Sequence, residues 1–267
     1  MKNLADRVVV ITGSSRGIGA KTASAFLEQG ARVAINGRNP DRLQKAQATI
    51  DPEKKNTLAI AGDMGDYEDS KRFISTVLKA WGTIDVLVCN AGIAMRGNFA
   101  DLTPLVLRSV IETNIFGTMF PALHALPILK DARGSILIVS SLAGIRGLPG
   151  ISVYSASKMA LTAFTDSLRT EVRDDGIHVG ILYVGFTEND PDKRIFRSDG
   201  ELMPLNRPNH LTQKDVARKI VYQVRKRRDA IVMSPVGKIF AFAERFAPWL
   251  VSFLLRNMNA KVAEMSK

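Results

Sequence analysis

Residues 12–19 read Thr12-Gly13-Ser14-Ser15-Arg16-Gly17-Ile18-Gly19. An apolar run that ends at Ile11 comes before them, and a helical pattern from Ala20 to Gln29 follows. Glycine lets the backbone approach a phosphate group closely, and a helix N-terminus offers free N–H groups and the positive end of the helix dipole. Glycine clusters also form ordinary turns, but the position between a first strand and a first helix indicates a dinucleotide site.

The rest of the chain alternates short apolar runs with longer helical patterns. The predicted strands are Arg7–Thr12, Arg32–Asn36, Thr57–Ala61, Ile84–Cys89, Ser135–Ser140, His178–Tyr183 and Ala230–Met233. The predicted helices are Gly17–Gln29, Pro40–Ile50, Tyr67–Trp81, Pro104–Leu129, Val153–Val172 and Lys214–Arg227. Strands that are apolar throughout are typical of a parallel sheet covered on both faces. The predicted fold class is α/β, a Rossmann-like, doubly wound parallel sheet of about seven strands in a three-layer α/β/α arrangement.

The length suits one large α/β domain or two small ones, and no internal repeat, low-complexity tract or linker divides the chain. The chain has 267 residues, of which 46% are hydrophobic and 24% charged, and Cys89 is its one cysteine. These values exclude a disordered chain and a disulfide scaffold. We predict one domain over residues 1–236 and a helical extension over residues 237–267. The polar segment Gly185–His210 contains three prolines, which predicts a long irregular loop that acts as a lid or binding loop.

The extension is basic and rich in aromatic residues. Residues 214–267 contain 12 Lys and Arg against 4 Asp and Glu, in a chain of net charge +11. The longest charge-free run, Phe246–Leu255, has 10 residues, whereas a membrane-spanning helix needs about 20. The extension therefore either lies on an anionic membrane surface or packs on the domain or on another subunit. No nucleic-acid-binding motif accompanies the charge, so no nucleic acid partner is expected.

Two further observations concern location and metals. Asp6 and Arg7 interrupt the N-terminal sequence, so we expect no signal peptide. A single cysteine suits a reducing compartment, and we expect a cytoplasmic protein with at most peripheral membrane contact. The three histidines do not cluster with cysteine or acidic residues at metal-ligand spacing, so no metal site is expected.

A second motif reads Tyr154-Ser155-Ala156-Ser157-Lys158 and lies in a predicted helix. Residues four apart share a helix face, so the phenol of Tyr154 and the ammonium of Lys158 project together. A nearby ammonium favours the phenolate, which lets a tyrosine exchange a proton with a substrate oxygen near neutral pH. Ser141 comes 13 residues before Tyr154, at the end of a predicted strand. Because successive strand residues face opposite ways, only one of Ser140 and Ser141 can face a ligand at the end of this strand.

Together these motifs resemble the short-chain dehydrogenase/reductase family. The matching patterns are TGxxxGxG at residues 12–19, Asn90-Ala91-Gly92 after the fourth predicted strand, and YxxxK at residues 154–158. The resemblance is to the single-domain type, loosely like hydroxysteroid dehydrogenase and 3-oxoacyl reductase members. It implies an oxidoreductase that moves a hydride between a nicotinamide and a carbonyl or secondary alcohol. The implied catalytic residues are Asn114, Ser141, Tyr154 and Lys158.

The resemblance also implies a role for each of these residues. Tyr154 is the general acid and base, and Ser141 holds the substrate oxygen as charge develops. Lys158 supports Tyr154 and bonds the nicotinamide ribose, and Asn114 anchors a water that relays protons to Lys158.

The end of the second predicted strand indicates which nicotinamide cofactor binds. Residues 35–39 read Ile-Asn-Gly-Arg-Asn, without the Asp or Glu that bonds the ribose 2′-hydroxyl of NAD(H). Arg38 offers instead a charged, bidentate contact to a 2′-phosphate, and Arg16 lies in the glycine turn. We therefore predict NADP(H) in preference to NAD(H).

By resemblance, Asp63 and Met64 contact the adenine, and the segment after the sixth predicted strand contacts the nicotinamide. There Val184 and Asn189 replace the usual proline and threonine of a PGxxxT pattern, and Asn189 still offers a hydrogen bond to the carboxamide. The predicted cofactor-binding residues are Gly13, Ser15, Arg16, Gly17, Ile18, Gly19, Arg38, Asp63, Met64, Asn90, Ala91, Gly92, Tyr154, Lys158, Gly185 and Thr187.

Mostly apolar residues are predicted to line the substrate pocket. They are Ile93, Met95, Phe99, Ile145, Leu148, Ile151 and Phe186. They suit a lipophilic fatty-acyl, sphingoid, steroid or retinoid carbonyl, and they equally suit a shield that keeps water from the nicotinamide. A non-catalytic dinucleotide sensor and a membrane-recruited adaptor remain alternatives. The resemblance further implies a homodimer or homotetramer packed through Pro104–Leu129 and Val153–Val172.

Overall fold

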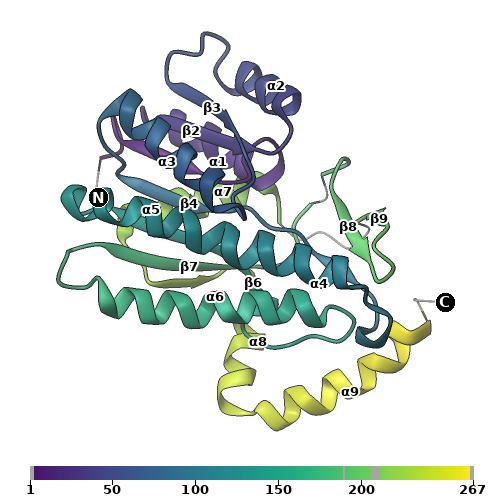
Figure 1. Cartoon of the computed structure of the whole chain (residues 1–267). Coiled ribbons are helices and arrows are strands. Elements are labelled where there is room, and N and C mark those ends of the chain that lie inside the picture. The colour runs from purple at the N-terminus through teal and green to yellow at the C-terminus, as the bar shows by residue number, and fades with distance from the viewer. Residues whose placement is uncertain (1–2, 189, 206–210, 265–267) are drawn as a thin grey trace.

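Seven parallel strands form the central sheet. The computed structural model describes residues 3–188, 190–205 and 211–264, and within them the strands lie in the order β10-β7-β6-β4-β1-β2-β3 (Figure 1). Their bounds are β1 Val8–Ile11, β2 Arg32–Gly37, β3 Thr57–Ala61, β4 Val86–Cys89, β6 Ser135–Ser141, β7 His178–Val184 and β10 Ala230–Val232. Every neighbouring pair is parallel, which confirms the predicted Rossmann-like α/β class.

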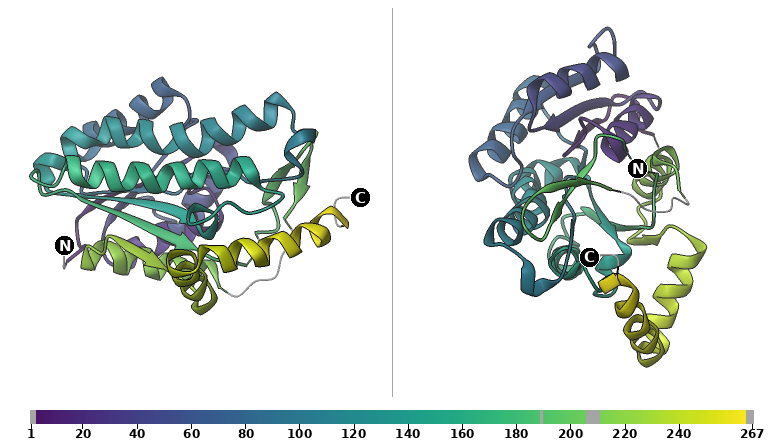
Figure 2. Two further views of the ribbon diagram at one scale, coloured as in Figure 1. Left: turned by 90° about the horizontal axis from the view of Figure 1, so that it is seen from below. Right: turned by 90° about the vertical axis from the view of Figure 1, so that its right-hand side faces the viewer.

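Helices cover both faces of the sheet and give three layers (Figure 2). Their bounds are α1 Gly17–Leu27, α2 Pro40–Ile50, α3 Tyr67–Trp81, α4 Pro104–Ile111, α5 Gly117–Ala132, α6 Ser152–Glu171 and α7 Gln213–Lys226. Successive strand residues point to opposite faces. In β1, Val8 and Val10 join the core that includes α3, α5 and α6, while Val9 and Ile11 join the core that includes α1, α2 and α7. Burial on both faces explains why the strands are apolar throughout.

The helix predicted over Pro104–Leu129 is present, but its geometry is not α-helical throughout. A π-helical turn, Glu112–Phe116, separates α4 from α5. The turn buries Asn114, whose Oδ1 accepts the N–H of Ile93 at 2.8 Å and whose Nδ2 donates to the Ile93 carbonyl at 3.0 Å. The apolar pattern continues through the turn because one wide turn changes the periodicity only locally.

The prediction of an irregular loop over Gly185–His210 is wrong for part of its length, because two strands form there. Strand β8 (Arg194–Arg197) pairs antiparallel with β9 (Leu202–Pro204) and parallel with β5 (Met95–Arg96). The hairpin turns near Gly200, whose φ of +97° favours glycine. Strands this short show no period in the sequence, and residues 206–210 lie outside the described residues.

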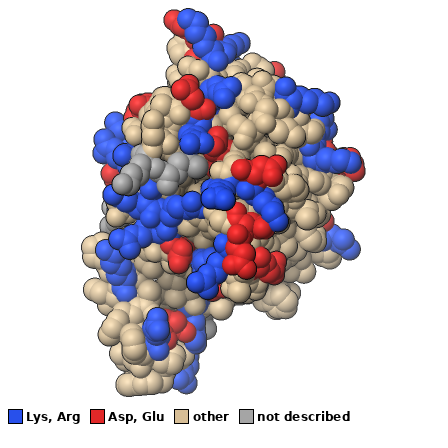
Figure 3. Space-filling view, turned by 90° about the vertical axis from the view of Figure 1, so that its left-hand side faces the viewer, with Lys and Arg blue, Asp and Glu red and all other residues tan. Residues whose placement is uncertain are grey.

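The extension forms two helices, α8 (Pro235–Phe246) and α9 (Pro248–Glu264), which lie beneath α6 in Figure 1. Arg146, in the segment before α6, holds both helices. Its Nη1 donates to the carboxylate of Glu244 and its Nη2 to the hydroxyl of Ser252, each at 2.8 Å. Charged residues of both signs spread over the face in Figure 3, while the lobe at its lower end, formed by the extension, is mostly uncharged. Within the described parts of the chain, no helix is long and apolar enough to cross a bilayer.

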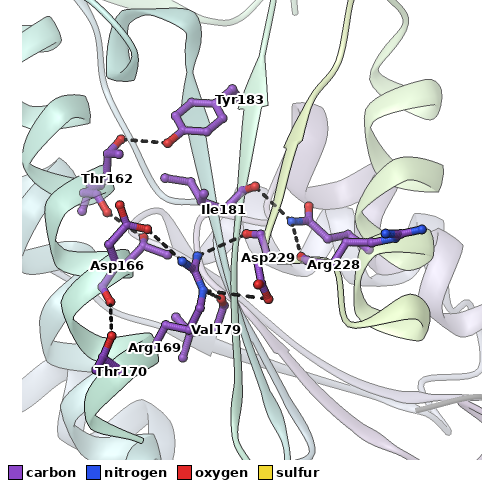
Figure 4. Close-up of polar contacts among 12 residues, drawn as sticks. Thr162, Asp166, Arg169, Thr170, Val179, Ile181, Tyr183, Arg228 and Asp229 are labelled. Atoms are coloured by element: carbon purple, nitrogen blue, oxygen red, sulfur yellow. Dashed lines mark hydrogen bonds and ion pairs between the residues drawn. The ribbon is translucent and has the colours of Figure 1, made fainter. Parts of the chain in front are cut away.

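Helix α6, which carries Tyr154 and Lys158, is held against strand β7 at its far end (Figure 4). The Arg169 guanidinium donates to the carbonyl of Val179 in β7 and to Asp166 in its own helix, both at 2.8 Å. Nearer the catalytic motif, the Tyr183 hydroxyl of β7 donates to Thr162 Oγ1 at 3.2 Å. These bonds fix the helix against β7 along much of its length.

Candidate active site

The site lies where the order of the strands reverses. Strand β1 pairs with β2 on one side and β4 on the other, and in such sheets ligands bind beyond the C-terminal ends of the strands at that point. Thr12 Oγ1 accepts the N–H groups of Asn90 and Ala91, both at 3.0 Å. Asn90 Nδ2 donates to the Gly13 carbonyl at 2.8 Å. The glycine turn and the Asn90-Ala91-Gly92 segment therefore form one braced unit.

The glycine turn has a shape that side chains would obstruct. Gly13 and Gly17 have φ values of +61° and +59°, which residues with a Cβ rarely adopt. A Cβ on Gly13 would lie 2.7 Å from Cα of Ala91, and one on Gly19 would lie 2.6 Å from Nδ2 of Asn90. No side chain of the described residues caps the N-terminus of α1. Its first N–H groups therefore point to a cradle that fits the phosphates of a dinucleotide.

We expect Gly19→Ala to weaken NADPH binding roughly tenfold or more and to lower the free energy of unfolding by about 1–3 kcal/mol, because the methyl group forces the turn and Asn90 apart. Calorimetric titration with NADPH and urea unfolding measure the two effects. Gly147→Ala is the matched control, because no described atom lies within 4 Å of a Cβ there. Equal behaviour of the two variants would contradict the cradle.

The other predicted residues of the turn and of β2 are close together. A Cβ on Gly37, at the end of β2, would lie 2.8 Å from Ser15 Oγ. Ile18 is partly buried against the core beneath α1. Arg38 Nη1 lies 3.6 Å from the carboxylate of Asp63, so the structure pairs the residue predicted for the 2′-phosphate with one predicted for the adenine. The Met64 side chain is buried in the core, which leaves only its backbone for a ligand.

Arg16 has an unusual environment. Its Nη1 is buried and has no hydrogen-bond partner in the described part of the chain. Burial lowers the pKa of its guanidinium, the charge of Asp190 opposes that shift and the charge of Arg42 adds to it. The Asp190 carboxylate lies over the start of α1, 3.5 Å from the position of a Cβ on Gly17. An anionic group therefore fits at this helix end beside Arg16, as a cofactor phosphate requires.

The structure brings four groups together at the N-terminal half of α6. Lys158 Nζ lies 5.9 Å from the centre of the Tyr154 ring. Asn114 Nδ2 donates to Ser157 Oγ at 2.9 Å, and that hydroxyl donates to the Tyr154 carbonyl at 2.7 Å. A Cβ on Gly92 would lie 3.2 Å from Asn114 Oδ1 and 3.5 Å from Lys158 Nζ. Ser157 joins these residues although the sequence analysis gave it no role, since it was one of two unassigned serines inside the motif.

The Lys158 ammonium is buried. Its Nζ donates to the carbonyl of Val139 at 3.1 Å. Burial lowers the pKa of its ammonium from 10.5 to about 8, the charge of Lys193 adds to the shift and Cys89 opposes it. The group is therefore mostly charged at neutral pH and loses its charge just above it.

We expect Lys158→Met to abolish turnover and yet raise the free energy of unfolding at pH 7. The lowering of the Lys158 pKa from 10.5 to about 8 means that burial of the charged ammonium destabilises the folded protein by roughly 3 kcal/mol. The lost hydrogen bond to Val139 reduces the expected gain to about 1–3 kcal/mol.

The pH dependence of this gain follows from the direction of the shift. Between pH 8 and 10.5 the folded protein binds fewer protons at Lys158 than the unfolded chain, so rising pH stabilises the unaltered protein. The advantage of Lys158→Met should therefore shrink across that window in urea titrations. A variant that is less stable at pH 7 and keeps a constant difference would contradict the buried charge.

The two serines at the end of β6 differ as the alternation predicts. Ser140 is buried, and a Cβ on Gly144 would lie 2.5 Å from its Oγ. Ser141 is half-buried, and its Oγ accepts the N–H of Ala143 at 3.3 Å. Ser141 therefore keeps a hydroxyl proton for a ligand at the strand end, and it remains the candidate.

The apolar residues near Tyr154 are only partly those predicted. Tyr154, Ile93 and Ile151 pack against a buried cluster that includes Met95, and Phe196 of β8 packs there as well. Phe196 was missed because it lies in the segment predicted as irregular. Of the other predicted wall residues, Phe99 and Phe186 are exposed, Ile145 packs on the core and Leu148 lines a groove beside α9.

The segment after β7 contains the remaining residues that were predicted to contact the cofactor. Thr187 is buried, and its hydroxyl donates to the Gly185 carbonyl at 3.1 Å. Asn189, predicted to face the nicotinamide carboxamide, lies outside the described residues. Among the described side chains, no group of three or more His, Cys, Asp or Glu is placed to hold a metal ion.

The chain is similar to known dehydrogenases over most of its length. The family described as short chain dehydrogenase matches residues 7–199. Dehydrogenase/reductase SDR family member 7B of Danio rerio is 34% identical over 245 residues, which cover 88% of this chain and 79% of that protein. The 11-beta-hydroxysteroid dehydrogenase-like 2 of Arabidopsis thaliana is 31% identical over 259 residues, which cover 95% of this chain and 82% of that protein.

A solved structure extends the likeness to the fold. A short chain dehydrogenase/reductase from Burkholderia phymatum, in complex with NAD, superposes with a TM-score of 0.83 at 19% identity and covers 94% of this chain and 96% of its own. The matched motifs, the sheet order and the relatives agree. The chain belongs to the short-chain dehydrogenase/reductase family of oxidoreductases.

Proposed function

We propose that this protein is an NADP(H)-dependent oxidoreductase that transfers a hydride between the nicotinamide and the carbon of a carbonyl or secondary alcohol. The observation that carries the proposal is the buried Lys158 ammonium, one helical turn from Tyr154 and 5.9 Å from its ring centre. A dinucleotide sensor has no use for a phenol held beside a buried cation. The pair therefore supports catalysis over binding alone.

The chain's own residues supply proton transfer and charge stabilisation. The nicotinamide cofactor, when bound, supplies the hydride that reduces the carbonyl carbon. Tyr154 donates its hydroxyl proton to the carbonyl oxygen, so the C=O group becomes CH–OH and Tyr154 is left as the phenolate. The Lys158 ammonium stabilises that phenolate, and the Ser141 hydroxyl donates a hydrogen bond to the oxygen as negative charge develops. In the oxidative direction the same groups act in reverse.

Asn114 and Ser157 act as positioning residues in this proposal. The bonds from Asn114 to Ser157 and from Ser157 to the Tyr154 carbonyl tie the π-helical turn to the start of α6. Asn114 also bonds the backbone at Ile93, so it fixes the segment that follows Gly92. A shift in any of these elements would move the phenol relative to the cofactor.

The preference for NADP(H) rests on charge at the end of β2 and in the glycine turn. No acidic residue occupies positions 36–39, and Arg38 is exposed there beside Asp63. The unpartnered Nη1 of Arg16 gives a second donor. Two guanidinium groups suit a dianionic 2′-phosphate and give no advantage with a neutral 2′-hydroxyl.

The substrate is proposed to be lipophilic. Ile93, Ile151 and Phe196 pack, as Tyr154 does, against one buried apolar cluster, and an apolar surface beside Tyr154 favours an apolar carbonyl compound. The similarity to a hydroxysteroid dehydrogenase-like protein supports the same class.

A panel of ketones tests the proposal. We expect NADPH oxidation to be faster with 2-decanone or a steroid ketone than with dihydroxyacetone, and faster with NADPH than with NADH. Preference for dihydroxyacetone would contradict the lipophilic substrate class, but it would still agree with an oxidoreductase. Tight NADPH binding with no turnover on any carbonyl or alcohol would favour the sensor instead.

The proposal includes a cytoplasmic homodimer or homotetramer packed through α4–α5 and α6. Apolar side chains are exposed on these helices, among them Leu105, Leu123 and Met159. Light scattering of the purified protein measures the mass, and a monomer at micromolar concentration would contradict this part.

A further inference from the structure

We propose that α8 and α9 form a docking face for an anionic lipid bilayer, which the protein binds from one side without spanning it. The face consists of the large apolar side chains that these two helices expose. They are Val236, Ile239, Phe242, Phe246, Trp249, Leu250, Phe253 and Leu254. Trp249 is 71% exposed and Phe242 66%, although aromatic side chains of this size are normally buried.

The apolar residues of each helix fall on one side. In α8 they recur at spacings of three or four, from Val236 through Ile239 and Phe242 to Phe246, which is one helix face. In α9 the exposed pairs 249–250 and 253–254 share a face, while Val251 between them is buried. The right-hand view of Figure 2 shows both helices projecting from the body of the domain.

Cations border this face and acids are turned away from it. Lys238, Arg245 and Arg256 are exposed. The only acidic residue among the described side chains of the two helices is Glu244, and Arg146 holds its carboxylate on the inner side at 2.8 Å. A surface with aromatic residues at its centre and cations at its rim is complementary to the acyl chains and anionic headgroups of a bilayer.

The same charges disfavour a second copy of this chain as the occupant. A symmetric contact brings the three exposed cations of one copy toward those of the other, in a protein that already carries a net charge of +11. Helix α9 does contact its own domain, but through the buried Val251 and the Arg146 bond to Ser252, on the side opposite the docking face. Contact with the domain therefore leaves the docking face uncovered.

The bonds from Arg146 to Glu244 of α8 and Ser252 of α9 fix how the docking face is oriented relative to the domain. Arg146 lies in the segment that leads to Ile151, which packs on the same buried cluster as Tyr154. A bilayer bound to the docking face therefore lies on the side of the domain that carries this segment. The docking itself does not depend on the proposed redox function, and it is measured without turnover.

Vesicle co-sedimentation tests the proposal with the full chain. We expect the protein to sediment with vesicles of equal parts phosphatidylcholine and phosphatidylglycerol, and to do so less with pure phosphatidylcholine or at high salt. The double variant Trp249→Glu, Phe253→Glu should lower the partition coefficient roughly tenfold or more. Tyr222→Glu, at an exposed aromatic residue of α7, is the matched control and should bind like the unaltered protein. Tyr154→Phe should also bind normally, which separates docking from catalysis.

Tryptophan fluorescence gives a second readout that does not depend on a disruptive variant. Trp81→Phe leaves Trp249 as the single tryptophan of the chain. Its emission should shift to the blue with anionic vesicles and be quenched by brominated acyl chains. Failure of the unaltered protein to sediment, or emission from Trp249 that vesicles leave unchanged, would overturn the proposal. A drop in oligomer mass for the double variant without loss of vesicle binding would overturn it in favour of a protein contact.

Discussion

Tyr154→Phe should lower kcat for NADPH-dependent ketone reduction about 10³-fold, since the variant keeps the ring and loses the proton that the carbonyl oxygen requires. The ring packs on the cluster of Met95, Val106, Val110 and Val153, so removal of one oxygen leaves that packing in place. The dissociation constant of NADPH should change by no more than about threefold, because the phosphates bind at the glycine turn. Stopped-flow oxidation of NADPH and calorimetric titration measure the two quantities separately.

Tyr183→Phe is the matched control for this variant. It removes the phenol hydroxyl of a tyrosine in β7, which donates at 3.2 Å to Thr162 on α6, the helix that carries Tyr154. We expect a loss of about 1 kcal/mol of stability and a kcat within about twofold of the unaltered enzyme. Equal losses of kcat for both variants would mean that the phenol of Tyr154 has a structural role and donates no proton.

The second large effect concerns the cofactor. The double variant Arg16→Ala, Arg38→Ala should reduce kcat/KM with NADPH roughly 100-fold and leave kcat/KM with NADH nearly unchanged. Each charge-assisted hydrogen bond to a phosphate contributes about 1.5–3 kcal/mol, and each 1.4 kcal/mol is a factor of ten. Arg16 is expected to contribute more per residue, because its Nη1 is already buried and lacks a partner among the described residues.

Lys45→Ala controls for net charge, since it removes one cation from an exposed position of α2. It should change kcat/KM with either cofactor by no more than about twofold. If the double variant loses activity equally with NADPH and NADH, the two arginines do not bind the 2′-phosphate. In that case the cofactor preference has another origin and the glycine cradle remains valid.

The sequence predicted most of the fold because the strands of the central sheet are mostly apolar on both sides and the helices that cover them have apolar faces. The short apolar runs at Val8–Ile11 and Thr57–Ala61 are typical of buried strands in a parallel sheet. The π-helical turn at Asn114 was not predictable, since it depends on the tertiary bonds between Asn114 and Ile93. The β8–β9 hairpin was missed for a related reason, because its strands are short and β8 pairs with two residues of β5 that are distant in sequence.

In the candidate site, too, the features set by local sequence were predictable, and those that depend on contacts between distant residues were not. The pairing of Tyr154 with Lys158 follows from helix geometry alone, and the structure places Lys158 Nζ beside the ring. The bond from Asn114 to Ser157 joins residues 43 apart, and nothing local to either residue indicates it. The burial that lowers the Lys158 pKa likewise comes from the surrounding fold, which the sequence alone does not quantify.

The most direct test of the central claim follows the hydride itself. NADPH carrying deuterium at C4 of the nicotinamide, in either of the two stereochemical positions, is incubated with the unaltered protein and 2-decanone. One of the two labelled cofactors should deliver deuterium to C2 of the alcohol product, and Tyr154→Phe should slow that delivery by the factor measured for kcat. An alcohol product without deuterium from either cofactor, or no product while NADPH remains bound, would contradict the account.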